Sequence, residues 1–239
     1  MTAPGIVAFD GDDTLWHNEP LFWATTRRFQ ELLAPYSDPD ALARRLEAAQ
    51  IANLALFGYG IKGFVLSMIE TAIAVSDGAV PAAVIHEFVE RGKDMLAHPV
   101  HLLDGAAEAL TQVRAMGVRL VLITKGDLFD QESKLARSGL ADQFDAVEIV
   151  SEKDRATYAR LFARHGVGAG AARPVMVGNS VRSDVLPVLA AGGHAVHVPY
   201  PSTWSHEMAD LPLGHPRLHQ AAGLARVPAI IAHLLSEPA

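Results

Sequence analysis

Short apolar segments that alternate with helical patterns constrain the fold of this chain more than any other feature. They occupy Ile6–Phe9, Val118–Thr124, Ala146–Val150, Pro174–Gly178 and Ala195–Pro199. Segments this short and this uniformly apolar are typical of parallel strands buried on both faces. Helical periodicity fills the intervals between the later ones, at Gly105–Met116, Asp127–Arg137 and Asp154–His165. The pattern predicts an α/β fold, with a doubly wound parallel sheet covered by helices on both faces.

The stretch from residue 17 to residue 100 has a different pattern. It contains no convincing strand and shows four amphipathic helical segments, at Leu21–Leu33, Asp38–Leu56, Ile61–Ala74 and Pro81–Leu96. We therefore expect a core domain made of residues 1–16 and 101–239, interrupted by an inserted all-helical cap domain of residues 17–100. An insertion directly after the first strand is expected to cover the carboxyl ends of the strands, where open α/β sheets bind ligands.

Composition narrows the possible partners. The 239 residues carry a net charge of −7, which argues against nucleic acid as the main partner, because its phosphate backbone attracts a basic surface. Phosphate esters remain possible, since a metal ion and a few placed cations can reverse the charge locally. The chain has no cysteine, which excludes disulfides, thiolate metal sites and a cysteine nucleophile. No apolar run reaches membrane-spanning length and no basic leader precedes the first strand, so a cytoplasmic protein is expected. The sequence leaves the oligomeric state open.

Three acidic residues follow the first apolar segment. Asp10, Asp12 and Asp13 lie in the sequence Phe9-Asp-Gly-Asp-Asp-Thr14. Three acids within four residues at a strand end are costly unless a positive group gathers them. The plainer interpretation is an acidic turn in which Asp12 and Asp13 cap a helix.

Polar residues also follow the second, third and fourth apolar segments. Thr124 and Lys125 end the second, Lys153 follows the third, and Asn179 and Asp184 follow the fourth. A hydroxyl and free backbone N–H groups at a strand-to-helix turn form an anion site. Each of these residues alone has an ordinary structural explanation, but all four loops are expected at the same edge of the sheet.

In this order and spacing the chain resembles the haloacid dehalogenase (HAD) superfamily. That superfamily has an Asp-x-Asp-x-Thr/Val motif, then a strand-end Thr or Ser, a Lys, and a Gly-Asp/Asn followed by an acid. The resemblance covers the whole chain, including the helical cap between the first and second motifs. It implies a Rossmann-like core and a Mg²⁺-dependent phosphohydrolase.

The resemblance also implies roles for the two acids of the first motif. Asp10 would attack phosphorus to give an aspartyl-phosphate. Asp12 would protonate the leaving oxygen and then deprotonate the water that hydrolyses the intermediate. Mg²⁺ would be held by Asp10, the backbone carbonyl of Asp12 and Asp184, with waters completing the octahedron.

The remaining motifs would bind the phosphoryl group and balance its charge. Thr124 and the N–H of Lys125 would bind phosphoryl oxygens, and Lys153 would offset negative charge in the transition state. Lys153 is preferred over Lys134 because Lys134 falls inside a predicted helix. The family commonly has Asp at position 179; Asn179 can still hydrogen-bond a metal-bound water, but it adds no charge and predicts slightly weaker Mg²⁺ binding.

Other functions of the same superfamily are left open. A sugar-phosphate mutase shares both aspartates and the helical cap. Haloacid dehalogenases, and phosphonate hydrolases with a cap lysine, lack the second acid, so Asp12 counts against both. A non-catalytic binding module usually loses the nucleophile, and Asp10 is present.

The substrate is expected to be a small phosphorylated metabolite, since a cap that closes over the site disfavours phosphoproteins. The turn Gly58–Lys62 joins two cap helices, and Lys62 is a candidate contact for a second polar group on the substrate. A solvated turn between helices is the plainer interpretation of the same residues.

Overall fold

The computed structural model of the protein describes residues 5–166 and 173–236. Its strands are β1 (Ile6–Phe9), β2 (Arg119–Lys125), β3 (Ala146–Val150), β4 (Val175–Gly178), β5 (His194–His197) and β6 (Leu218–Gln220). Its α-helices are α1 (Glu19–Leu33), α2 (Pro39–Phe57), α3 (Ile61–Val75), α4 (Ala82–Ala97), α5 (Ala106–Arg114), α6 (Leu128–Ser138), α7 (Arg155–Arg164), α8 (Leu186–Ala190) and α9 (Val227–Ser236). These elements divide between two compact units.

The first unit contains a six-stranded sheet in the order β3-β2-β1-β4-β5-β6, with every neighbouring pair parallel. This unit comprises residues 1–17, 100–125 and 131–239. The order reverses between β1 and β4, which is the doubly wound arrangement of Rossmann-like folds. The predicted fold class is confirmed. Because all strands run in the same direction, the residues that follow β1, β2, β3 and β4 emerge at one edge of the sheet.

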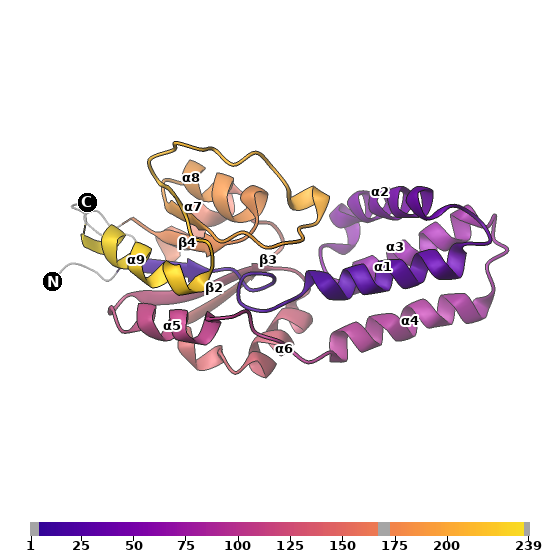
Figure 1. Ribbon diagram of the computed structural model, residues 1–239, viewed down its shortest axis with the longest axis horizontal. Coiled ribbons are helices and arrows are strands. Elements are labelled where there is room, and N and C mark those ends of the chain that lie inside the picture. Colours follow the sequence, from indigo (N-terminus) through magenta and orange to yellow (C-terminus); the bar gives the residue numbers. More distant parts are fainter. Residues whose placement is uncertain (1–4, 167–172, 237–239) are drawn as a thin grey trace. The chain divides into compact units, whose positions relative to one another are not determined.

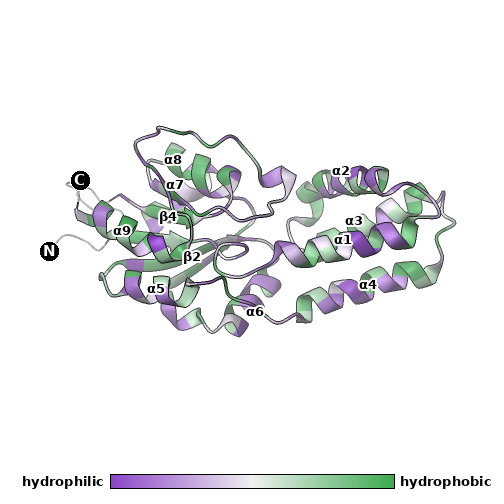
Figure 2. Cartoon of the chain, viewed as in Figure 1, coloured by the Kyte–Doolittle hydropathy of each residue, from purple (hydrophilic) through white to green (hydrophobic). Residues whose placement is uncertain are grey.

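Both faces of the sheet are buried. Val7, Phe9, Leu120 and Leu122 point to one face, where they share a core with residues of α5, α6 and α9. Alternate residues of the same strands point to the other face and share a second core with α7 and α8. The central strands β1, β2 and β4 are therefore hydrophobic along most of their length, as Figure 2 shows for β2. Burial on both sides explains the uninterrupted apolar segments in the sequence.

The second unit is helical and contains α1 to α4 with residues 126–130, so it spans residues 18–99 and a short segment after β2. Its core includes Phe29, Leu46, Phe64, Met68 and Phe88. The Asp38-Pro39 pair starts α2: the Asp38 carboxylate accepts a hydrogen bond from the N–H of Ala41 at 2.9 Å, and the proline occupies the first turn.

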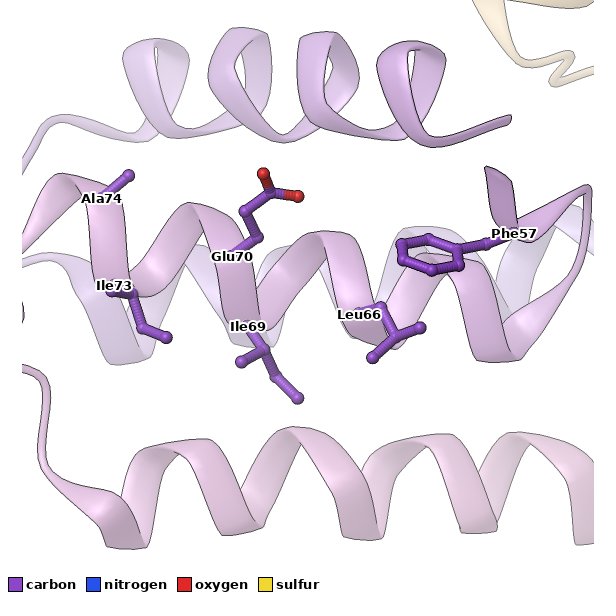
Figure 3. A pocket seen from close by; sticks show the side chains of 6 residues that line it. All are labelled: Phe57, Leu66, Ile69, Glu70, Ile73 and Ala74. Carbon is purple, nitrogen blue, oxygen red and sulfur yellow. The ribbon is translucent and has the colours of Figure 1, made fainter. Parts of the chain in front are cut away.

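One side of α3 carries apolar side chains that are not covered. Leu66 and Ile73 are each exposed by more than two fifths, and Phe57 at the end of α2 is half exposed. Together with Ile69, Glu70 and Ala74 they line a shallow hollow of about 470 Å³, in which the ring of Phe57 lies beside Leu66 (Figure 3). Among the described helices, none combines the length and hydropathy needed to cross a bilayer.

The chain leaves and re-enters the sheet unit at paired positions. Trp16 and Leu102 form an antiparallel bridge. The N–H of His17 donates to the carbonyl of His101 at 2.9 Å, and the N–H of Leu103 donates to the carbonyl of Leu15 at 2.9 Å. The two connections to the helical segment therefore start from adjacent points of the sheet unit.

Candidate active site at the carboxyl edge of the sheet

A tight loop positions the acids that follow β1. The carbonyl of Gly11 accepts hydrogen bonds from the N–H groups of Thr14, Leu15 and Trp16. Asp13 adopts φ 61°, a left-handed conformation that Asp tolerates better than most residues. The indole of Trp16 lies against Gly11 so closely that a Cβ there would clash with the ring. The loop thus begins at the end of β1 and points Asp10 and Asp12 toward the sheet edge.

Lys153 joins the nucleophile candidate to the acid that follows β4. Its Nζ lies 2.5 Å from Asp10 Oδ1 and 2.7 Å from Asp184 Oδ1. All three residues are buried, and the side chain of Lys153 is only 2% exposed. The other oxygen of Asp10 lies 3.2 Å from the hydroxyl of Thr14. The structure therefore gathers the residues at the ends of β1, β3 and β4 around a single ammonium group.

Burial and charge shift the ionisation of this group. Burial raises the pKa of Asp10 to about 7; Lys153 opposes that rise and Asp184 adds to it. Burial would lower the pKa of Lys153, but Asp10 and Asp184 outweigh it and hold that pKa above its ordinary value. Lys153 therefore stays charged at neutral pH and balances the two acids in part.

Asp184 lies in one turn of π-helix, Val181–Val185, directly after β4. Its Oδ2 accepts a hydrogen bond from the N–H of Ser180 at 3.0 Å. The hydroxyl of Tyr158, from α7, lies 3.4 Å from its Oδ1 and donates to the carbonyl of Ser183 at 3.0 Å. A Cβ at Gly178 would collide with the Asp184 carboxylate, so the close approach of that side chain to β4 requires glycine there.

The carboxylate of Asp12 points to a different set of donors. It accepts hydrogen bonds from Trp16 Nε1 at 2.6 Å and Gln131 Nε2 at 2.9 Å. Lys134 Nζ lies 3.0 and 3.1 Å from its two oxygens. Gln131 and Lys134 come from α6 and are buried. Three donors from two segments therefore fix the orientation of this carboxylate.

Thr124 and Lys125 lie at the end of β2. The Thr124 hydroxyl is buried and lies 3.3 Å from Gln131 Oε1, which links it to Asp12 through one side chain. The ammonium group of Lys125 contacts Glu207 Oε1 at 2.5 Å and Ser183 Oγ at 2.8 Å. The side chain of Lys125 thus makes these polar contacts within the sheet unit.

Asn179 follows β4 and contacts the first motif. Its backbone N–H donates to the Thr14 hydroxyl at 3.1 Å, and its Oδ1 lies 3.2 Å from the same hydroxyl. The Thr14 hydroxyl therefore connects Asn179 to Asp10. The role of the Asn179 side chain toward a metal-bound water stays a prediction.

Lys62 belongs to the helical unit. Its Nζ lies 3.0 and 2.9 Å from the two carboxylate oxygens of Asp127, and its side chain is 57% exposed. Burial raises the pKa of Asp127, but the hydrogen bond and charge of Lys62, together with backbone hydrogen bonds from Asp130 and Phe129, outweigh it and keep that pKa below its ordinary value. The charge of Lys62 is matched within its own unit, and its contact with substrate stays a prediction.

The donor set fits a hard divalent cation. Two buried carboxylates, Asp10 and Asp184, share one ammonium group, which leaves negative charge to be balanced. Oxygen ligands of this kind are those that Mg²⁺ prefers. Within residues 5–166 and 173–236 no three acidic or histidine side chains gather into a metal cluster. Binding of Mg²⁺ by Asp10, Asp184 and the backbone carbonyl of Asp12 stays a prediction.

Sequence reasoning missed Gln131, Tyr158 and Glu207, and it set Lys134 aside because that residue falls inside a predicted helix. A cation or an amide on a helix is usually solvated, whereas Lys134 and Gln131 are buried. Tyr158 belongs to no sequence motif, because the helical pattern accounts for it as a buried apolar position of α7. Glu207 lies in a 3₁₀ turn, Ser205–Glu207, far from every motif. The i, i+3 spacing of Gln131 and Lys134 was the one available sign that both could share a partner.

Comparison with known proteins identifies the family. The model of the haloacid dehalogenase-like hydrolases matches residues 5–192, and the chain belongs to that family. A search of curated proteins returns no match.

Three solved structures illustrate the range of relatives. A haloacid dehalogenase-like family hydrolase from Xanthomonas campestris shares 42% identity with a TM-score of 0.86, over 98% of this chain and 92% of that one. A 2-haloacid dehalogenase from Pseudomonas syringae shares 21% identity with a TM-score of 0.62, over 96% and 99% of the two chains. A protein described as a predicted phosphoglycolate phosphatase from Haemophilus somnus shares 14% identity with a TM-score of 0.61, over 97% and 99%. The last two show a common fold alone.

The contacts of Asp12 lead to a prediction of stability. Lys134→Met keeps most of the side-chain volume but removes the cation that contacts both oxygens of Asp12. We expect the free energy of unfolding, measured in urea, to fall by about 1–3 kcal/mol. Arg164→Met is the matched control, because it removes an exposed ion pair with Glu148 of similar length, 2.9 Å, from the same unit. That control should cost less than about 1 kcal/mol. Equal losses in the two variants would show that Lys134 acts as a surface residue.

Proposed function

We propose that this protein is a Mg²⁺-dependent phosphomonoester hydrolase that acts on a small phosphorylated metabolite through an aspartyl-phosphate on Asp10. The observation that carries the proposal is the contact of Lys153 with both Asp10 and Asp184 at the carboxyl edge of the sheet. Asp12, two residues beyond the nucleophile, supplies a second carboxylate for proton transfer. Family membership supports hydrolysis; phosphate as the group transferred is our inference from these residues.

In the first step, a carboxylate oxygen of Asp10 attacks phosphorus as the bond to the leaving oxygen breaks. Lys153 orients Asp10 and balances charge that develops on the phosphoryl group. The hydroxyl of Thr124 and the N–H of Lys125 bind phosphoryl oxygens. Asp12 gives a proton to the leaving oxygen, so that the alcohol departs neutral.

In the second step, Asp12 takes a proton from a water molecule that attacks the aspartyl-phosphate. This returns Asp10 to its carboxylate form, releases inorganic phosphate and leaves Asp12 protonated for the next cycle. Bound Mg²⁺, held by Asp10, Asp184 and the carbonyl of Asp12, would supply a positive charge that screens the phosphate from the acids.

Two other reactions of related folds make different use of the same residues. A dehalogenase attacks carbon and has no need of a second acid, so Asp12 and its three donors favour phosphoryl transfer. A mutase would return the phosphoryl group to a second hydroxyl of the substrate instead of giving it to water. The three reactions are distinguished by assaying their products in parallel: inorganic phosphate, halide and isomerised sugar phosphate.

The nucleophile is tested by Asp10→Asn, which removes charge but almost no volume. We expect release of p-nitrophenolate from p-nitrophenyl phosphate to fall by at least about three orders of magnitude. Asp142→Asn makes the same substitution at an exposed position and should retain wild-type turnover. Wild-type activity in purified Asp10→Asn protein would exclude Asp10 as the nucleophile.

The metal is tested by chelation. EDTA should abolish phosphate release and added Mg²⁺ should restore it. Asp184→Asn should raise the Mg²⁺ concentration needed for half-maximal activity by about tenfold or more, because it removes one anionic ligand. Full activity in EDTA, together with chloride release from 2-chloropropionate, would indicate the metal-free dehalogenase reaction instead.

The role of Asp12 is tested by leaving-group dependence. Asp12→Asn should slow formation of the aspartyl-phosphate much less for p-nitrophenyl phosphate than for an alkyl phosphate, because p-nitrophenolate needs little protonation. Burst-phase measurement isolates that step. If both substrates slow by the same factor, Asp12 is not the general acid.

A further inference from the structure

Glu207 is a partly buried acid that no motif of the family accounts for. It lies in the segment between β5 and β6, and its side chain is 13% exposed. Its carboxylate accepts hydrogen bonds from Ser183 Oγ at 2.5 Å, Ser180 Oγ at 2.7 Å and Lys125 Nζ at 2.5 Å. A buried carboxylate is retained only where donors replace its hydration, and here two serines and a lysine do so.

The two serines frame the turn that carries Asp184. Ser180 Oγ accepts a hydrogen bond from the N–H of Ser183 at 3.0 Å, which caps the π-helical turn. The N–H of Ser180 donates to Asp184 Oδ2. Each serine therefore donates its hydroxyl proton to Glu207 while its backbone helps to shape the turn around Asp184. Arg182, between them, donates to the carbonyl of His206 at 3.1 Å and ties the same two segments together.

Glu207 also holds the ammonium group of Lys125 in position. Burial raises the pKa of Glu207, but Lys125 and the two serines outweigh it and keep that pKa below its ordinary value. The ionised acid holds the Lys125 ammonium against Ser183, 2.8 Å away. The charge of the Lys125 side chain is thus balanced by Glu207, while the backbone N–H of Lys125 lies at the end of β2.

We propose that Glu207 is a positioning residue for Mg²⁺: it orients Asp184 by holding Ser180 and Ser183, without contacting the metal or the substrate itself. This inference rests on the proposed function, since it assumes that Asp184 is a Mg²⁺ ligand. Partners that orient a metal ligand commonly change metal affinity by about 10–100-fold when they are removed.

The proposal is tested by Mg²⁺ binding to the full-length protein, measured by isothermal titration calorimetry with MgCl₂ and no substrate. Glu207→Ala should weaken binding about tenfold or more, because both serines lose their acceptor. Glu207→Gln keeps a carbonyl that can accept from them, and its affinity should lie between those of the wild type and Glu207→Ala. Thermal unfolding of each variant establishes that it is folded.

Glu152→Gln is the matched control. Glu152 lies 3.7 Å from the same lysine and is half exposed; its carboxylate also accepts a hydrogen bond from the N–H of Lys153 at 2.9 Å, and glutamine keeps an oxygen that can accept this bond. Its Mg²⁺ affinity should stay within about twofold of the wild type, as expected for an exposed ion pair.

The proposal is supported if Glu207→Gln weakens Mg²⁺ binding, Glu207→Ala weakens it further, and Glu152→Gln leaves it unchanged. It is overturned if both Glu207 variants bind within twofold of the wild type, if they weaken equally, or if Glu152→Gln weakens as much. A purely structural role would lower the unfolding temperature without changing Mg²⁺ affinity. If the wild type itself binds no Mg²⁺, the proposed function fails and this inference fails with it.

Discussion

The site depends on one buried ammonium group that contacts two buried carboxylates. Each charge would be costly in this environment by itself, because burial removes its hydration. Lys153 balances Asp10 and Asp184 in part, the Thr14 and Tyr158 hydroxyls and the N–H of Ser180 add hydrogen bonds, and removing one member of such a group typically costs about 3–5 kcal/mol. The interaction also joins segments that follow three strands of the sheet. Folding and active-site assembly therefore depend on the same contacts.

Other interactions orient the carboxylates of Asp12 and Asp184. Asp12 is held from α6, whereas Asp184 is held through its serines from the segment between β5 and β6. The two sets come from separate parts of the chain and share no donor. The carboxylates of Asp12 and Asp184 are thus oriented by different parts of the chain.

Much of this arrangement was predictable from the sequence, and the reasons are local. Burial on both faces makes the strands uniformly apolar, and polar residues at four strand ends must meet because parallel strands share an edge. These two rules place Asp10, Thr124, Lys153 and Asp184 without coordinates. β6 was not predicted, because its Leu218-His219-Gln220 segment has no apolar run and gains its pairing from β5. Glu207 could not be found, and Lys134 was weighed only as an alternative to Lys153, since the partners of both residues are set by tertiary packing.

The paired connections at Trp16 and Leu102 have a consequence for how such a protein can change over evolutionary time. A segment whose two ends start from adjacent backbone positions can vary in length and sequence without disturbing the strands on either side. The hydrogen bonds between His17 and His101 and between Leu15 and Leu103 join the two ends of that segment within the sheet unit. Residues 18–99 can therefore diverge between relatives while the residues at the sheet edge are inherited unchanged.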